Sequence, residues 1–285
     1  MIDLRLTGDI RARDKAPSDY SGSEPMLRLN NIQAVCFDLD GTLADTAADL
    51  GFAAEEMMIE LGLPFGGIED VRDWVGDGTD CLIHRVLTRH LDGRVPDRVF
   101  NRANPLFTKA YQNRKHRATK LYPGAEACLE RLHNMGISLA CVTNKQTAQA
   151  NEVLEGLGVR HYFSQVMGRD SVRKAKPSPD GLLDAADRMQ VNIRRMVMVG
   201  DSVNDVRAAR AAGCRVVAVS YGYNYGVDIG SANPDTVIDS LAVVPDMLVP
   251  APTLRRLDRI STRFVPKINT GCRTDMTPGG HLLSE

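Results

Sequence analysis

Short apolar segments alternate with helical patterns along the middle of the chain, and this alternation constrains the fold more than any other feature. The apolar segments lie at 34–37, 138–142, 163–167, 196–199 and 216–219, with a shorter candidate at 236–238. Segments this short and this apolar are typical of strands that are buried on both faces of a parallel sheet. Helical patterns lie at 46–61, between Thr143 and about Leu157, and at 203–212. This order predicts an α/β fold, a Rossmann-like, doubly wound parallel sheet with helices on both faces and right-handed crossovers.

A long interruption of this alternation separates the first strand from the second. From about Gly62 to Leu121 the apolar residues recur with helical spacing, and no strand pattern is present. Two helices are expected there, over 79–91 and over 97–111, where Pro105 predicts a kink. We therefore predict a flexible tail over 1–25, a catalytic α/β core over 26–61 and 121–249, an inserted helical cap over 62–120 and a second tail over 250–285.

The net charge limits the partners of the chain, because 35 basic residues almost balance 36 acidic ones and leave −1 over 285 residues. Such a chain has no positive field that would hold nucleic acid or an anionic membrane without specificity. No apolar run approaches the roughly 18–20 residues that cross a bilayer, and residues 1–25 contain no hydrophobic stretch typical of a signal peptide. We predict a cytoplasmic protein without nucleic-acid or membrane partners, whose six cysteines are free thiols. The sequence assigns no oligomeric state.

Polar residues follow the predicted strands at the points where the strands end. They are Asp38 to Thr42 after the first strand, Thr143 and Asn144 after the second, Lys176 before a predicted helix, and Gly200 to Asp205 after the fourth strand. Ligands of open parallel sheets bind beyond the carboxyl ends of the strands. Each of these residues alone is common turn or helix-cap chemistry. Four carboxylates, one hydroxyl and one ammonium group at the same edge of a sheet predict a functional site.

The residue types at this edge indicate phosphoryl transfer. Carboxylates on one edge repel one another unless a cation lies among them, and all-oxygen ligands favour Mg²⁺. One carboxylate can attack phosphorus and form an aspartyl-phosphate, while a second acts as general acid and then as base. Lys176, Thr143 and loop amides suit the charge of a transferring phosphoryl group. The residues alone therefore predict metal-assisted phosphoryl transfer through a covalent intermediate.

The same residues resemble the four motifs of the haloacid dehalogenase superfamily, over about residues 32–248. The matched positions are DxDGT at 38–42, the hydroxyl residue at Thr143, the lysine before proline at Lys176, and GDxxxD at 200–205. The resemblance implies a phosphatase core with a helical cap, in which Asp38 is the nucleophile and Asp40 the general acid and base.

The resemblance also implies which residues bind metal and substrate. The implied Mg²⁺ ligands are Asp38, the backbone carbonyl of Asp40 and Asp201, with Asp205 supporting the site. The implied substrate-binding residues on the core are Thr143, Asn144 and Lys176.

Three further stretches are similar to the phosphoglycolate phosphatases of this superfamily. They are 74–79, 82–87 and 221–224, the last followed by Pro234 and Asp235. The dehalogenases of the superfamily lack the second carboxylate, so Asp40 also favours a phosphatase. This similarity implies hydrolysis of 2-phosphoglycolate, a small phosphorylated acid, to glycolate and phosphate, with the glycine loop at 76–78 closing over the site.

The carboxylate of such a substrate needs a donor from the cap, and a guanidinium suits it best. The helix predicted near Thr79 carries Arg85 at the edge of its apolar stripe. We predict Arg85 as the ligand of the substrate carboxylate. The competing interpretation is that Arg85 is a solvated surface residue, since arginine is usually exposed.

Other functions are compatible with the same residues. A capped phosphatase for a sugar phosphate, a nucleotide or pyrophosphate would have identical catalytic residues. A sugar phosphomutase of the same fold would retain the phosphoryl group. A phosphate-binding regulator without catalysis is the alternative from a different class, and the presence of both Asp38 and Asp40 disfavours it.

Overall fold

The computed structural model describes residues 27–114 and 116–250. The predicted N-terminal tail over 1–25 lies outside these residues, as do Met26, Cys272 and all of the predicted C-terminal tail over 250–285 except Pro250, which ends a short strand. The cysteines within the described ranges are all free thiols, which agrees with the prediction, and they are Cys36, Cys81, Cys128, Cys141 and Cys214.

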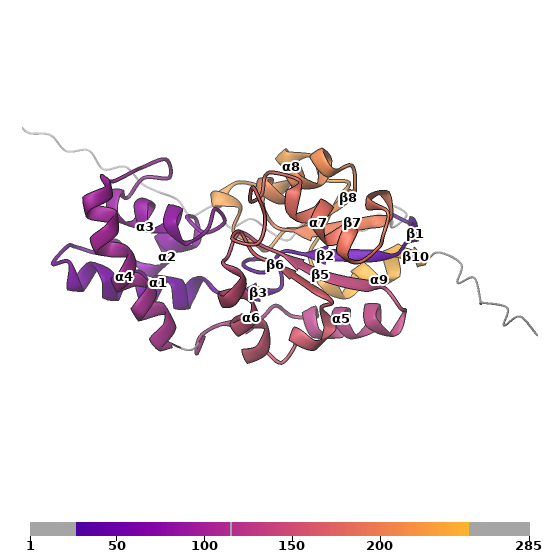
Figure 1. Ribbon diagram of the computed structural model, residues 1–285, viewed down its shortest axis with the longest axis horizontal. Helices are drawn as coiled ribbons and strands as arrows, with labels where there is room; N and C mark the ends of the chain where they lie inside the picture. Colours follow the sequence, from indigo (N-terminus) through magenta and orange to yellow (C-terminus); the bar gives the residue numbers. More distant parts are fainter. Residues whose placement is uncertain (1–26, 115, 251–285) are drawn as a thin grey trace, which may run out of the picture. The chain divides into compact units, whose positions relative to one another are not determined.

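A six-stranded, wholly parallel sheet forms the core of the described chain (Figure 1). Its strands are β2 (Ala34–Phe37), β5 (Ser138–Val142), β6 (Gln165–Met167), β7 (Met196–Gly200), β8 (Arg215–Val219) and β9 (Thr236–Ile238). They stand side by side in the order β6-β5-β2-β7-β8-β9. Because consecutive strands are parallel, each connection must cross a face of the sheet, and helices fill these connections. The α/β prediction is confirmed.

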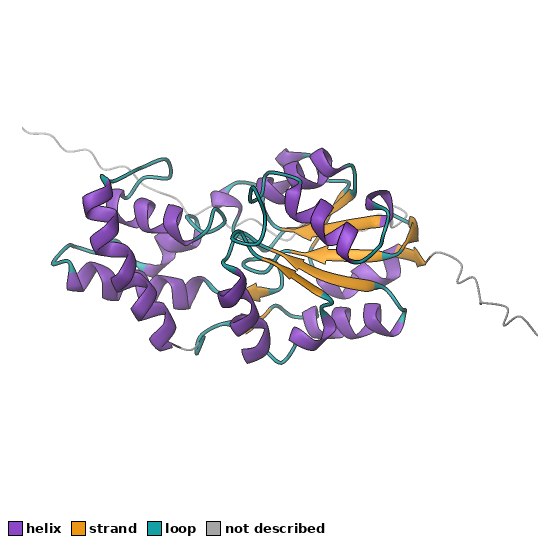
Figure 2. Cartoon of the chain, viewed as in Figure 1, coloured by secondary structure: helices purple, strands orange, loops and turns teal. Residues whose placement is uncertain are grey.

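Helices cover both faces of this sheet, as Figure 2 shows. The helices are α5 (Ala125–Asn134) and α6 (Thr147–Gly156) on one face, and α7 (Asp180–Arg188) and α8 (Val203–Ala212) on the other. Alternate residues of β2 point to opposite faces, so Phe37 belongs to the same apolar cluster as Leu129, while Cys36 belongs to the cluster that contains Leu182. Burying each large apolar side chain contributes roughly 1.5–3 kcal/mol. The all-apolar strands of the sequence are therefore buried on both sides.

Four helices between β3 and β4 form a separate apolar cluster. They are α1 (Ala47–Glu60), α2 (Ile68–Arg72), α3 (Thr79–Thr88) and α4 (Asp97–Arg114), and α4 continues through Pro105. Buried side chains such as Met57, Ile83 and Phe107 make up this cluster. Because α1 shares it, we propose that the helical cap includes α1 in addition to the predicted 62–120. Within the described residues, no helix has the length and hydropathy needed to cross a membrane.

Two pairs of very short strands were not predicted. They are β1 (Leu29–Ile32) with β10 (Leu248–Pro250), which are parallel, and β3 (Ala44–Asp45) with β4 (Lys120–Leu121), which are antiparallel. The β3–β4 pair joins the two points where the chain leaves the sheet for the helices and returns. Strands of two residues have no periodicity to detect. The remaining short helices are α9 (Val244–Met247) and 3₁₀ turns at Arg160–Tyr162, Ile193–Arg195, Asn224–Gly226, Ile229–Ala232 and Leu241–Val243.

A fully buried carboxylate, Asp49 of α1, holds the returning segment against the helices. Its oxygens accept hydrogen bonds from Arg114 Nε at 3.0 Å and from Thr119 Oγ1 at 2.8 Å. The backbone amides of Ala118 and Thr119 also donate to Asp49, at 3.0 and 2.8 Å. Burial alone would raise the pKa of Asp49, but the hydrogen bonds from Thr119 and Arg114 outweigh it and the pKa is lowered.

Replacement of Asp49 by alanine is expected to lower the free energy of unfolding at pH 7 by about 3 kcal/mol, because a partly buried cation and two amides lose their partner. A lowered folded-state pKa contributes stability above the ordinary pKa of 3.8, and this contribution is lost as the pH falls through the folded-state value. The difference between wild type and Asp49→Ala should therefore shrink below about pH 4. Urea denaturation at pH 7 and pH 3 measures it, with the exposed Glu60→Ala as control. A difference that is the same at both pH values would contradict this account.

Candidate active site

The carboxyl ends of three neighbouring strands carry the predicted site residues. Asp38 follows β2, Thr143 follows β5 and Asp201 follows β7. Phe37 is level with Cys141 on one side and with Val199 on the other, so these side chains reach the same edge of the sheet. The structure thus brings together residues that are more than 160 positions apart in the sequence.

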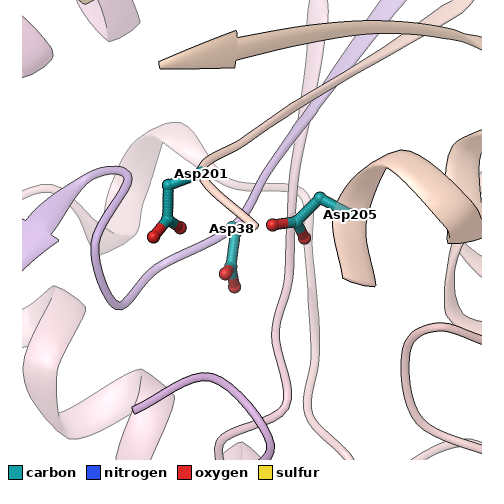
Figure 3. A group of neighbouring side chains, drawn as sticks. All are labelled: Asp38, Asp201 and Asp205. Atoms are coloured by element: carbon teal, nitrogen blue, oxygen red, sulfur yellow. The ribbon is translucent and has the colours of Figure 1, made fainter. Parts of the chain in front are cut away.

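Three carboxylates meet at this edge, as Figure 3 shows for Asp38, Asp201 and Asp205. Each offers an oxygen that lies within 4.8 Å of the other two, and all three residues are buried. Lys176 joins them, with its Nζ 2.9 Å from Asp38 Oδ1 and 2.7 Å from Asp205 Oδ1. Burial opposes the charge of Lys176, but Asp205 and Asp38 outweigh it and the pKa of Lys176 is raised.

The three acidic groups are suited to a metal ion. Burial raises the pKa of Asp38 to about 6, and burial together with Asp205 and Asp38 raises the pKa of Asp201 to about 8. Asp38 Oδ1 is buried, with Lys176 Nζ 2.9 Å away. A divalent cation among these oxygens would add positive charge and favour the ionised carboxylates. Oxygen ligands of this kind select a hard ion such as Mg²⁺.

Glycine lets the backbone approach these carboxylates closely. Gly41 has φ +87°, and a Cβ there would lie 2.4 Å from Asp201 Oδ2. Asp201 accepts hydrogen bonds from Thr42 Oγ1 at 2.9 Å and from the amide of Tyr223 at 2.8 Å. A side chain at position 41 would push Asp201 away, which is the physical reason for glycine after the second aspartate. The sequence comparison included Tyr223 in the stretch 221–224 but gave it no role.

Asp40 lies beside this carboxylate group and has its own partners. Its Oδ1 accepts a hydrogen bond from Thr46 Oγ1 at 2.6 Å, and Lys145 Nζ donates to Oδ1 and Oδ2 at 3.0 and 3.2 Å. The ammonium group of Lys145 also lies 5.1 Å from the centre of the Tyr111 ring. Burial opposes the charge of Lys145, but Asp40 outweighs it and the pKa of Lys145 is raised. Sequence reasoning missed Lys145, although it stands only two residues after Thr143.

Thr143 and Asn144 occupy different positions at the end of β5. Thr143 is buried and lines the cavity beside Asp38. Asn144 also borders the cavity, but its Nδ2 donates to the backbone carbonyls of Gly76 at 2.9 Å and of Lys176 at 3.0 Å. The amide nitrogen of Asn144 therefore ties the glycine loop of the cap to the loop that carries Lys176. A direct contact between Asn144 and substrate stays a prediction.

The glycine loop of the cap lies over the carboxyl ends of the strands. Its central residue, Asp77, accepts hydrogen bonds from Asn204 Nδ2 at 2.8 Å and from Tyr225 Oη at 2.9 Å, both on the sheet domain. Arg85 of α3 completes an ion pair with the same carboxylate. Burial alone would raise the pKa of Asp77, but the hydrogen bonds from Arg85 and Asn204 outweigh it and the pKa is lowered. Asp77 thus fastens the loop to the sheet domain.

The position of Arg85 differs from both interpretations of the sequence. Arg85 is only 9% exposed, so it is not a solvated surface residue. Its Nε donates to the carbonyl of Leu91 at 2.8 Å and its Nη1 to the carbonyl of Trp74 at 2.7 Å, while Nη2 contacts Asp77. All three nitrogens are engaged within the cap, and Arg85 does not border the cavity beside Asp38. These contacts favour a role for Arg85 in shaping the glycine loop, and we propose that role in place of the predicted contact with the substrate carboxylate.

A small cavity, partly open to solvent, lies between cap and sheet. Its sheet-domain wall consists of Asp38, Asp40, Thr143, Asn144 and Lys145. Its cap wall includes Val75, Gly76, Gly78, Thr79 and Leu82. Asp38, the second aspartate Asp40 and the glycine loop therefore border one cavity.

Comparison with known proteins identifies relatives along the same part of the chain. Residues 35–219 match the family model of haloacid dehalogenase-like hydrolases. The chain is 39% identical over 220 residues to a phosphoglycolate phosphatase of Nitrosococcus oceani, which covers 77% of this chain and 98% of that protein. It is 42% identical over 210 residues to a phosphoglycolate phosphatase of Nitrosospira multiformis, which covers 74% of this chain and 92% of that protein.

A solved structure supports the same relationship. The crystal structure of a predicted phosphoglycolate phosphatase from Haemophilus somnus superimposes with a TM-score of 0.72 and 31% sequence identity, over 76% of this chain and 97% of that one. The family match extends from before Asp38 to beyond Asp205 and so includes the whole carboxylate group. On this evidence the chain belongs to the haloacid dehalogenase-like hydrolase family.

Proposed function

We propose that this hydrolase is a Mg²⁺-dependent phosphatase that converts 2-phosphoglycolate to glycolate and phosphate. The observation that carries the proposal is the buried group of Asp38, Asp201 and Asp205 beside Lys176. Within this group, Asp38 borders the same cavity as Asp40. The relatives from Nitrosococcus oceani and Nitrosospira multiformis, both phosphoglycolate phosphatases, support the substrate. A cytoplasmic location, and the absence of nucleic-acid and membrane partners, stay predictions.

In the proposed reaction Asp38 and Asp40 act in sequence. A carboxylate oxygen of Asp38 attacks phosphorus, the bond from phosphorus to the leaving oxygen breaks, and Asp40 gives its proton to that oxygen. Glycolate then leaves an aspartyl-phosphate on Asp38. In the second half Asp40 takes a proton from a water molecule, whose oxygen attacks phosphorus. The bond between Asp38 and phosphorus breaks, and free phosphate and both carboxyl groups are regenerated.

The neighbouring residues hold the phosphoryl group and the metal in this proposal. Lys176 lies within 3 Å of Asp38 and would offset charge on the phosphoryl oxygens, together with the hydroxyl of Thr143. Asp38, the backbone carbonyl of Asp40 and Asp201 would hold Mg²⁺. The bound ion would neutralise negative charge that the lysines do not balance. Asp205 would act indirectly, by fixing Lys176 through their 2.7 Å ion pair.

Phosphate release from a panel of substrates tests the function. We expect wild-type enzyme with Mg²⁺ to prefer 2-phosphoglycolate over glucose 6-phosphate, AMP and pyrophosphate by about 100-fold in kcat/KM, because a site with built-in partners discriminates strongly.

EDTA should stop phosphate release and added Mg²⁺ should restore it, whereas Asp201→Ala should need far more Mg²⁺ because it loses a ligand oxygen. Preference for another ester would reassign the substrate. Retention of the phosphoryl group on a sugar product would identify a mutase, and full activity without metal would refute the metal site.

Substitution of Asp38 and substitution of Asp40 are expected to block different steps of the reaction. Asp38→Asn should lower kcat by about 10⁴-fold or more with the fold retained, since an amide is a poor nucleophile and loss of a nucleophile has effects of this size. Asp40→Asn should still react once with p-nitrophenyl phosphate, whose leaving group needs no proton, and should then hydrolyse the phospho-enzyme slowly. Stopped-flow absorbance measures this burst, which should approach one equivalent per active site. Asp92→Asn, an exposed cap aspartate, is the control. Wild-type turnover in Asp38→Asn would rule out the covalent mechanism.

A further inference from the structure

Lys145 is a buried cation without a role in the reaction proposed above. Among the described residues that line the cavity beside Asp38, it is the only lysine or arginine. Its side chain is 3% exposed, and it does not belong to any of the four motifs recognised in the sequence. Burying an ammonium group is costly unless the site holds negative charge for it. Its position therefore calls for anionic partners at this end of the cavity.

The cations near the site divide between its two ends. Lys176 contacts Asp38 and Asp205 and is thereby committed to the end where phosphorus is attacked. Arg85 has all three nitrogens engaged within the cap. Lys145 instead contacts Asp40, the proposed acid, at 3.0 and 3.2 Å. It consequently stands at the end where the leaving group departs.

The covalent structure of phosphoglycolate places its carboxylate at this same end. The leaving oxygen must lie within hydrogen-bond reach of Asp40 to receive the proton. The carboxyl carbon is two bonds from that oxygen, and so about 2.4 Å away. A charge that close to Asp40 is also close to Lys145. Without a cation there, the substrate carboxylate would face the acidic group with no compensation.

The contacts of Lys145 leave capacity for such a ligand. An ammonium group has three N–H donors, and the two oxygens of Asp40 engage at most two of them here. The ring of Tyr111 lies 5.1 Å from Nζ and holds the ammonium group in place. The hydroxyl of Tyr111 also faces this ammonium group and contributes to the raised pKa of Lys145, so a substrate oxygen would share the third donor with that hydroxyl.

We propose that Lys145 binds the substrate carboxylate and is the residue that makes the enzyme specific for small phosphorylated acids. The proposal rests on the proposed function, since it needs a substrate with a carboxylate two bonds from the leaving oxygen. Lys145 takes over the role that the sequence had suggested for Arg85. Its ammonium group pairs with the carboxylate in the bound state and still contacts Asp40 through its remaining donors.

The test compares two substrates that differ only in the carboxylate. Ethyl phosphate has a leaving group of similar size to that of phosphoglycolate but carries no second charge. For Lys145→Met, which removes the charge and keeps most of the volume, kcat/KM for phosphoglycolate should fall at least about 30-fold more than kcat/KM for ethyl phosphate. The extra loss should be mainly in KM. Lys109→Met, an exposed lysine on α4, is the matched control and should leave both substrates unchanged.

The alternative role for Lys145 is to position Asp40 alone, and the same data exclude or establish it. Equal losses for both substrates would overturn the proposal, because both reactions need a proton from Asp40. Lys145→Arg should retain most of the preference for phosphoglycolate. If circular dichroism and thermal unfolding show that the Met variant does not fold, kcat/KM for the two substrates is compared in Lys145→Gln instead, which keeps a donor for Asp40.

The proposed function can fail separately. A wild-type enzyme that shows no preference for phosphoglycolate over ethyl phosphate would overturn the assigned substrate and, with it, the role of Lys145. A wild-type enzyme with that preference, combined with a Lys145→Gln variant that keeps it, would overturn the role of Lys145 alone.

Discussion

The contact of Lys176 with Asp38 and Asp205 is the interaction on which the site depends. Three carboxylates lie within 4.8 Å of one another at the end of a buried sheet, where their repulsion is poorly screened. The ammonium group of Lys176 bridges two of them at 2.9 and 2.7 Å. Burial still raises the pKa values of Asp38 and Asp201, so one lysine does not balance the group. This residual negative charge is what prepares the site for a divalent cation.

The second buried lysine gives the cavity two chemically different ends. Lys176 forms an ion pair with the carboxylates at the end of the sheet, and Lys145 forms one with Asp40 toward the cap. The glycine loop closes over the cavity between them and is fastened through Asp77 to Asn204 and Tyr225. These fastening residues stand in stretches that are adjacent to the catalytic ones, so docking of the cap and assembly of the site involve the same segments of the chain.

The predicted elements that were recovered are those with strong local patterns. The strand at 34–37 and the helix at 203–212 appear as β2 and α8, because an all-apolar run and a 3.6-residue period are properties of nearby residues. The β3–β4 pair was missed, since each strand has two residues and forms only when distant segments meet. Pro105 lies inside α4, which runs to Arg114, and the kink expected there stays a prediction. Placing α1 with the cap likewise depends on packing with α4, which no local pattern encodes.

For the site, the sequence determined which chemical groups are present and that they follow strand ends. Asp38, Asp40, Thr143 and Asp201 could be named because the carboxyl ends of neighbouring parallel strands must share an edge. Tertiary structure alone decided which cation pairs with which anion. Arg85 and Lys145 each stand near a plausible partner in the sequence, yet Arg85 is held by Leu91, Trp74 and Asp77, while Lys145 reaches Asp40. Ion pairing depends on distances of a few ångströms between side chains that are far apart in the chain, and folding sets those distances.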